Sequence, residues 1–206
     1  VNPLLVSVRS GGPVSMPGMM ETILNLGMSD AVIAQADPSA VHFLLDDYRR
    51  LIQMYGDVVA GIDGALFAEA FDAFEAIEEG APGHDDLSAL VDTFKSVYKT
   101  ATGSDFPQDA REQLVTAVAA VFDSWNAPRA QVYRAQSGIP EDAGTAANVV
   151  QMVFGNRDSL SATGVCFSRD PATGEPGLYG EFLPEAQGED IVAGTRTPLP
   201  VIEMKE

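Results

Sequence analysis

The chain has 206 residues, 46% of them hydrophobic and 20% charged, so it can bury a sizeable core and does not have the composition of a disordered sequence. Its 12 basic and 30 acidic residues give a net charge of −18, and because no basic cluster offsets this charge we expect neither nucleic acid nor an anionic membrane as a partner. The single cysteine, Cys166, fits a reducing compartment, and with no signal-peptide pattern and no membrane-spanning apolar run we expect a cytoplasmic or, in a eukaryote, organellar location.

The N-terminal residues predict a strand, a loop and two helices. Residues 4–8 are β-rich and apolar, and residues 11–18 are loop by composition. Residues 19–26 look helical and are ended by Gly27. Ser29 or Asp30 then caps a helix over residues 31–36.

The middle of the chain is helical by pattern. Apolar residues recur at helix spacing over several segments, which glycine and proline separate. The predicted helices cover 44–59 and 65–79, a third that follows a cap at Asp85 or Asp86 and ends at Gly103, a fourth from near Pro107, and a shorter one after Pro128.

After Gly144 the pattern changes to strands. Residues 145–155 and 163–171 each predict one strand, and residues 177–194 contain at least one more. Strands at both ends of the chain with helices between them predict an α+β fold that carries a helical insertion.

The stretch SVRSGGPVSMPGMM, residues 7–20, is the best candidate for a binding loop. Glycines let a backbone approach a ligand closely, and Arg9 presents a planar set of donors that suits phosphate. Methionines add soft apolar surface, which suits a flat ring. The alternative is a surface ion pair for Arg9 and core packing for the methionines. The stretch matches neither established glycine-rich nucleotide motif.

Seven stretches, in order along nearly the whole chain, resemble the pyruvate, phosphate dikinase family. They are LLVSVRSG, SMPGMMETILNLG, YRRLIQMYGDVV, FDSWNAPRAQVYR, VQMVFGN, GVCFSRDPATGE and YGEFLPEAQGEDIVAGTRTP. The resemblance implies part of an ATP-grasp nucleotide-binding domain. Residues 1–28 and 108–155 would form its first subdomain, 29–107 an inserted helical subdomain, and 156–206 part of a second subdomain.

The resemblance also implies a reaction. In this family ATP phosphorylates a histidine on another domain and inorganic phosphate, and the phosphohistidine then phosphorylates pyruvate. The products are AMP, diphosphate and phosphoenolpyruvate, and Mg²⁺ is required. The expected partners are therefore ATP, inorganic phosphate, and the phosphohistidine and pyruvate-binding domains of the same parent chain, which we expect to be a homodimer.

The implied site residues fall on the matching motifs. Arg9 would bind the polyphosphate and act in catalysis, and the other residues would bind nucleotide or control conformation. The nucleotide-binding set is Gln151, Met152 and Val153 along the adenine, Thr163 and Gly164 over the phosphates, and Glu189 and Asp190 in the cleft, with Arg50 and Arg129 as docking or conformational residues.

Ordinary structural roles remain open for several of these residues. Gln151 could be a satisfied glutamine of a sheet, and Glu189 with Asp190 could form a solvated turn. Arg50 could form a helix-surface ion pair with Asp46 or Asp47.

Three family features are absent from the sequence. It lacks the glycine-and-lysine segment that holds the ATP phosphates, the later strand with the Mg²⁺ carboxylates, and the phosphohistidine motif. His42 and His84 lack that motif's setting and are expected to be ordinary histidines. Because phosphoryl transfer depends on such charge-stabilising groups, we expect the chain alone to be inactive, with its Mg²⁺ ligands elsewhere in the intact enzyme. The alternative is a truncated, non-catalytic binding or regulatory module derived from this domain.

Overall fold

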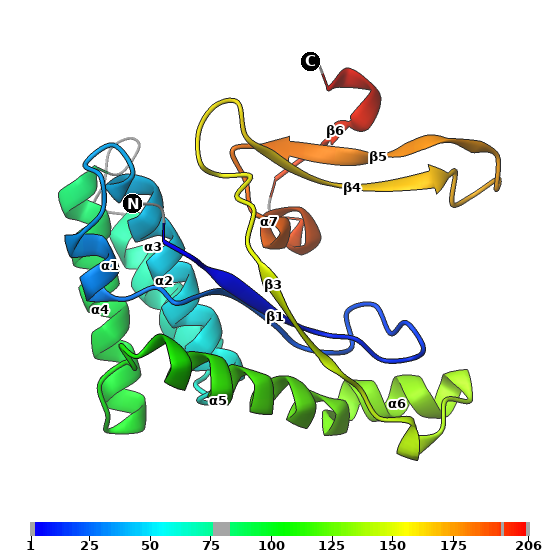
Figure 1. Ribbon diagram of the computed structural model, residues 1–206, viewed down its shortest axis with the longest axis horizontal. Helices are drawn as coiled ribbons and strands as arrows, with labels where there is room; N and C mark the ends of the chain where they lie inside the picture. Colours follow the sequence, from blue (N-terminus) through cyan, green and yellow to red (C-terminus); the bar gives the residue numbers. More distant parts are fainter. Residues whose placement is uncertain (1–2, 76–82, 195, 205–206) are drawn as a thin grey trace. The chain divides into compact units, whose positions relative to one another are not determined.

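The computed structural model describes residues 3–75, 83–194 and 196–204 (Figure 1). The chain folds into two compact units, Val1–Met152 and Val153–Glu206. Both helices and sheets are present, which confirms the α+β class. The finer division into segments 1–28, 29–107, 108–155 and 156–206 stays a prediction.

The first unit contains a three-stranded antiparallel sheet. Its strands are β1 (Val6–Ser10), β2 (Thr22–Leu26) and β3 (Ala147–Gln151), in the order β2-β1-β3. The central strand β1 places Arg9 opposite Thr22 on one side and Asn148 on the other. Segments far apart in the sequence therefore meet at Arg9.

The helix predicted over residues 19–26 is wrong, because β2 occupies Thr22–Leu26. Ile23, Leu24 and Leu26 are all buried, so both faces of this short strand are covered. A short apolar run of this kind fits a buried strand and a buried helix equally well, and only pairing with β1 decides between them.

Helices connect β2 to β3 and carry most of the first unit's core. In α2 the buried side chains include Leu44, Tyr48, Leu51 and Tyr55, which recur at helix spacing as predicted. The helices are α1 (Asp30–Ala34), α2 (Val41–Val58), α3 (Gly64–Glu75), α4 (His84–Thr102), α5 (Ala110–Asp123) and α6 (Pro128–Ser137), with short 3-10 turns at Ser124–Asn126 and Glu141–Ala143. Residues 76–79 of the predicted second helix lie outside the described residues.

Side-chain caps decide where two of these helices begin. The Ser29 hydroxyl accepts a hydrogen bond from the Val32 amide at 3.4 Å, which confirms one of the two predicted caps of α1. In α5 the Asp109 carboxylate accepts from the Glu112 amide at 2.8 Å. The helix therefore starts at Ala110, three residues later than Pro107, where the proline suggested its start.

An aromatic cluster joins the helices of the first unit around Phe106. The ring centroid of Phe106 lies 6.1 Å from that of Tyr48, 5.4 Å from Tyr55 and 5.3 Å from Tyr98. All four side chains are buried. The cluster packs α2 and α4 against the segment that leads into α5.

The second unit is built on a β-hairpin. β4 (Ala162–Arg169) and β5 (Pro176–Pro184) pair antiparallel, and the two-residue β6 (Leu199–Pro200) adds to β5. A short helix, α7 (Gly188–Ala193), contacts β4, and a 3-10 turn at Val201–Glu203 contacts β5. β4 lies where the sequence predicts it.

Candidate functional site

The loop after β1 encloses a hollow of about 550 Å³, which we call the loop hollow. The loop leaves the sheet at Gly11, whose amide donates to the Ala146 carbonyl at 2.8 Å. Among the residues that line the hollow there is no charged side chain, although the chain carries a net charge of −18. The lining residues are Ser10, Gly11, Gly12, Pro13, Val14, Ser15, Met16, Pro17, Gly18, Met20, Thr22, Trp125 and Thr145. A hollow of hydroxyls, backbone and methionines without carboxylates is compatible with an anionic ligand.

Arg9 lies at the mouth of this loop, one residue before the lining begins. Its side chain is exposed, and its Nε donates to the Ser7 hydroxyl at 3.1 Å. Arg9 forms no ion pair with any described residue, so its terminal donors remain available for a phosphate oxygen.

The second arm of the loop is attached to the start of α6. The Arg129 guanidinium pairs with the Glu21 carboxylate, and its Nε donates to the Met19 carbonyl at 3.2 Å. The Glu21 amide donates to the Ser124 hydroxyl at 3.2 Å. Arg129, expected to act in docking or conformation, therefore contacts residues at the end of the candidate binding loop, and its docking role stays a prediction.

One wall of the loop hollow rests on a buried arginine that sequence reasoning did not identify. The Arg134 side chain is fully buried, and its guanidinium lies 4.1 Å from the centroid of the Trp125 ring. It also bonds to the Trp125 carbonyl and to the Glu141 carboxylate, 2.7 Å away. The Trp125 indole donates to the Glu141 carbonyl at 3.2 Å. These contacts hold the tryptophan that lines the hollow.

The predicted adenine strand runs along the edge of the described sheet. Gln151 is exposed and lies opposite Val6, while the Met152 amide donates to the Leu5 carbonyl at 2.9 Å. Val153 begins the second unit and is 93% exposed. Gln151 therefore shares a sheet with Arg9, whereas Met152 is hydrogen-bonded to the residue before β1. Contact of these residues with adenine stays a prediction.

Thr163 and Gly164 lie at the start of β4, opposite Leu183 and Phe182 of β5. A side chain on Gly164 would place its Cβ 2.7 Å from the Glu181 carbonyl oxygen, so glycine is needed for the close approach of the two strands. This packing accounts for the glycine, and a phosphate-covering role for both residues stays a prediction.

Glu189 and Asp190 lie in the first turn of α7, which packs beside β4. The Asp190 carboxylate accepts a hydrogen bond from the Gln187 amide at 2.8 Å, so this residue caps the helix. Glu189 is half-buried. They are not a solvated turn, and their predicted position in a nucleotide cleft stays a prediction.

Arg50 lies on α2 in an ion-pair cluster. Its Nε is 2.9 Å from the Asp46 carboxylate, which Arg49 also binds at 2.6 Å. Burial alone would raise the pKa of Asp46, but the two guanidinium groups outweigh this effect and leave the pKa below its ordinary value. The ion pair considered from sequence is thus formed, and a docking role for Arg50 stays a prediction.

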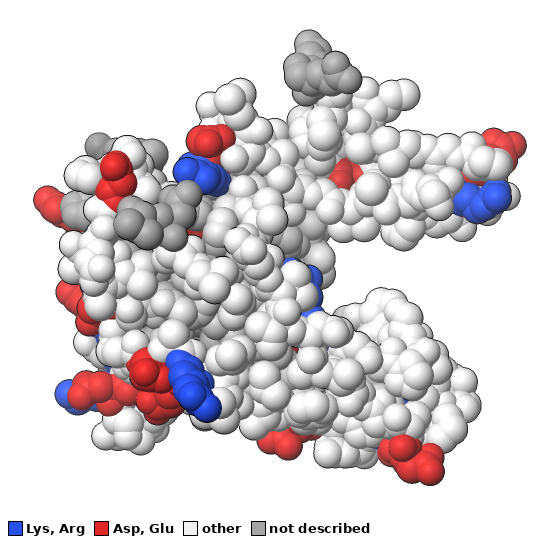
Figure 2. Space-filling view, viewed as in Figure 1, with Lys and Arg blue, Asp and Glu red and all other residues white. Residues whose placement is uncertain are grey.

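No group of three or more histidine, cysteine, aspartate or glutamate side chains among the described residues could hold a metal ion. None of the helices described is long and apolar enough to cross a membrane. On the face shown in Figure 2, acidic side chains recur at many places and basic ones lie beside several of them.

Comparison with known proteins identifies the family. The family model described as "Pyruvate phosphate dikinase, AMP/ATP-binding domain" matches residues 1–205. The chain is 51% identical to pyruvate, phosphate dikinase of Clostridium symbiosum, over 99% of this chain and 24% of that protein. It is 52% identical to the chloroplastic pyruvate, phosphate dikinase of Flaveria trinervia, over 95% of this chain and 21% of that protein.

A third relative, pyruvate, phosphate dikinase 1 of Arabidopsis thaliana, is chloroplastic and 51% identical, over 98% of this chain and 22% of that protein. The chain thus spans less than a quarter of the length of these curated relatives. An ATP-grasp type of fold fits this family and the α+β structure. The chain belongs to the family of AMP/ATP-binding domains of pyruvate phosphate dikinase.

Proposed function

We propose that this chain is the nucleotide-binding part of a pyruvate, phosphate dikinase. The parent enzyme would use ATP to phosphorylate a histidine on another of its domains and inorganic phosphate, and that histidine would pass its phosphoryl group to pyruvate. AMP, diphosphate and phosphoenolpyruvate would be the products. The parent would be a homodimer, and this chain alone would be inactive because it supplies only part of the groups that stabilise the transferred phosphoryl.

The proposal depends on one observation, the exposed state of the Arg9 side chain and its lack of an ion pair among the described residues. In a chain with 30 acidic residues, it is an exposed arginine on the central strand that makes no ion pair with the residues described. It stands beside a hollow without charged side chains. A planar guanidinium in this setting suits the oxygens of a nucleoside triphosphate, since it can donate two parallel hydrogen bonds.

The remaining predicted residues would position the rest of the nucleotide. Because the Met152 amide already donates to Leu5, Met152 would face adenine through its carbonyl or its side chain. Gln151 and Val153, both exposed, would complete the adenine contacts. Thr163, Gly164, Glu189 and Asp190 of the second unit would contact the phosphates or line the cleft.

Mg²⁺ is expected in the intact enzyme, but the described residues do not fit it. No cluster of three carboxylates, histidines or cysteines is present among them. The ligands would have to come from other parts of the parent, and no step of the reaction is assigned to a metal held by this chain.

Isothermal titration with ATP and Mg²⁺ tests the proposal. The chain would be compared with a chimera in which sequence of the Clostridium symbiosum relative extends it at both ends. We expect at least tenfold tighter binding by the chimera. Arg9→Ala in the chimera should weaken binding by about tenfold or more, since a charged hydrogen-bonded contact is worth about 1.5–3 kcal/mol.

The matched control is Arg111→Ala, which removes an exposed arginine of α5 and should leave the affinity unchanged. If Arg9→Ala binds ATP as tightly as the parent chimera, the assigned role of Arg9 is wrong. Equal affinity of the short chain and the chimera would instead contradict the proposal that this chain supplies only part of the groups that hold the ATP phosphates.

A further inference from the structure

The four helices α1–α4 leave and rejoin the sheet-bearing part of the first unit through two short connections. Residues 27–29 lead from β2 into α1, and residues 103–109 lead from α4 into α5. A helical segment on two such connections could swing as a lid, provided that the backbone of the connections is free to change its torsion angles. The hydrogen bonds and packing of residues 27–29 and 103–109 decide whether their backbone has this freedom.

Gln113 of α5 binds both connections at once. Its side chain is fully buried, its Oε1 accepts from the Gly27 amide at 2.8 Å, and its Nε2 donates to the Met28 carbonyl at 2.9 Å and the Pro107 carbonyl at 2.8 Å. A buried side-chain amide thus satisfies three backbone groups from two segments about 80 residues apart in the sequence.

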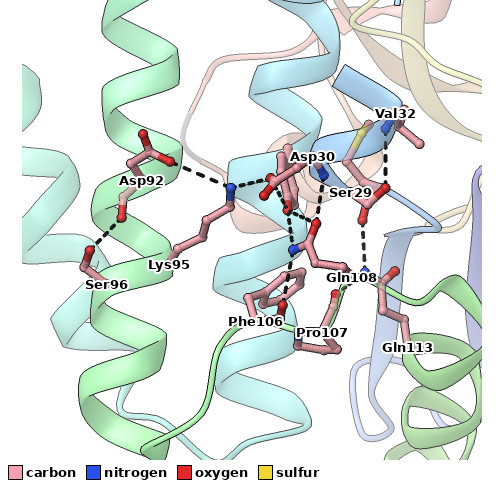
Figure 3. Close-up of polar contacts among 12 residues, drawn as sticks. Ser29, Asp30, Val32, Asp92, Lys95, Ser96, Phe106, Pro107, Gln108 and Gln113 are labelled. Carbon is pink, nitrogen blue, oxygen red and sulfur yellow. Dashed lines mark hydrogen bonds and ion pairs between the residues drawn. The ribbon is translucent and has the colours of Figure 1, made fainter. Parts of the chain in front are cut away.

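Gln108 makes a second bridge nearer the surface. Its Oε1 accepts from the Asp30 amide at 2.9 Å, and its Nε2 donates to the Tyr48 hydroxyl at 2.9 Å. The Asp30 carboxylate in turn binds Lys95 of α4 and the Tyr48 hydroxyl. Figure 3 shows Gln108, Asp30 and Lys95 joined in this network, with Gln113 close by.

Gly27 lies in a connection and has a positive φ, as a hinge glycine could, but it is tightly packed. Its φ is +104°, and a Cβ there would lie 3.1 Å from the Leu4 carbonyl oxygen. Its amide is held by Gln113. The positive φ therefore allows the close crossing of two segments, and rotation about this residue would break its partly buried hydrogen bond to Gln113.

The neighbouring strand is attached to the helices in the same way. Asn25 of β2 is fully buried at a φ of +61°, and its Nδ2 donates to the Asp47 carbonyl of α2 at 3.3 Å. The Leu24 amide approaches the Met54 sulfur of α2 at 3.2 Å. Helix α2 therefore packs directly on β2, independently of the two connections.

We propose that Gln113 and Gln108 fix α1–α4 to the sheet, so that the helices and the sheet of the first unit move as one rigid body and the helices do not act as a lid. The inference does not depend on the proposed function, because it concerns the chain without any ligand.

Hydrogen exchange of the wild-type chain tests this directly. The Gly27 amide should exchange as slowly as the Val8 amide of the central strand, because both would require unfolding of the whole unit. In Gln113→Met, the Gly27 amide should exchange at least tenfold faster relative to Val8. The matched control, Gln131→Met, removes an exposed glutamine of α6 and should leave the ratio of the Gly27 and Val8 exchange rates unchanged. Fast exchange of Gly27 in the wild type would overturn the proposal.

A distance measurement covers the case in which Gln113→Met does not fold. Spin labels at Ala89→Cys of α4 and Val115→Cys of α5, both exposed positions, would be introduced on a Cys166→Ser background. One narrow distance distribution is expected, and it should broaden in Gln108→Met, which alters an exposed side chain. Two populations or a broad distribution without Gln108→Met would show that the helices hinge.

Discussion

At the scale of single residues, several buried polar side chains hold parts of the first unit together. Arg134 is the largest example, because a charged group with no exposed surface must be compensated by its neighbours. Its compensation comes from the Trp125 ring and carbonyl and from Glu141, whose own side chain is 70% exposed. The guanidinium therefore ties the wall of the loop hollow to the segment that precedes β3.

We predict that Arg134→Met destabilises the first unit by about 2–3 kcal/mol, since the hydrogen bond to the Trp125 carbonyl and the stacking on its ring are lost together. Trp125 is the single tryptophan of the sequence, so urea unfolding followed by its fluorescence reports on this region. Arg111→Met, at an exposed position of α5, should change the free energy of unfolding by less than about 0.5 kcal/mol. Equal effects of the two substitutions would show that burial of Arg134 contributes little.

At the scale of elements, the second unit depends on close backbone packing beside its hairpin. Gly155 is buried, and a Cβ there would lie 2.4 Å from the Ala186 carbonyl oxygen and 2.6 Å from that of Ala162. The Ala186 amide donates back to the Gly155 carbonyl at 2.9 Å. Three backbone segments thus meet at Gly155 with no room for a side chain there. This packing joins the start of the second unit to β4 and to the residues before α7.

Gly155→Ala should therefore destabilise the second unit by about 1–3 kcal/mol, because backbone on two sides would have to move. The control is Gly177→Ala in β5, where no atom lies within 4 Å of the added Cβ. Thermal unfolding followed by circular dichroism, with hydrogen exchange of the Ala186 amide to locate the effect, compares the two variants. If Gly155→Ala and Gly177→Ala had the same thermal unfolding midpoint, the backbone around Gly155 would accommodate a Cβ without loss of stability.

Predictability from sequence also differs by element. The long helix α2 is predicted well because its buried stripe repeats over many turns, whereas five-residue β2 is missed because its apolar run has no clear period. Gln113 and Arg134 carry no local signal of burial, since their partners lie at positions 27, 28 and 107 and at 125 and 141. Sequence alone singles out Arg9 as a candidate because a strand, an arginine and a glycine-rich loop are adjacent there, and its binding role stays a prediction.

At the scale of the whole molecule, stability depends on pH through groups that the fold buries. Burial raises the pKa of Tyr48, Tyr55 and Tyr98 above the ordinary value of 10.0, and these three rings surround Phe106. The folded state thus favours the neutral phenol, whereas the unfolded chain ionises near the ordinary value. Their contribution to stability is complete below about pH 10 and is lost as the pH rises through the folded-state values.

We therefore predict that the first unit loses stability steeply as the pH rises above about 10, and that the phenolate absorbance of these tyrosines appears together with unfolding. Tyr98→Phe is the sharpest variant, since Tyr98 packs on Phe106 and its hydroxyl makes no hydrogen bond to the residues described. Its urea midpoint near neutral pH should match that of the parent, while its loss of stability at alkaline pH should be shallower, because one fewer proton is released on unfolding. An alkaline slope as steep as that of the parent would show that Tyr98 ionises equally easily in the folded and unfolded chains, and that the aromatic cluster around Phe106 is open to water.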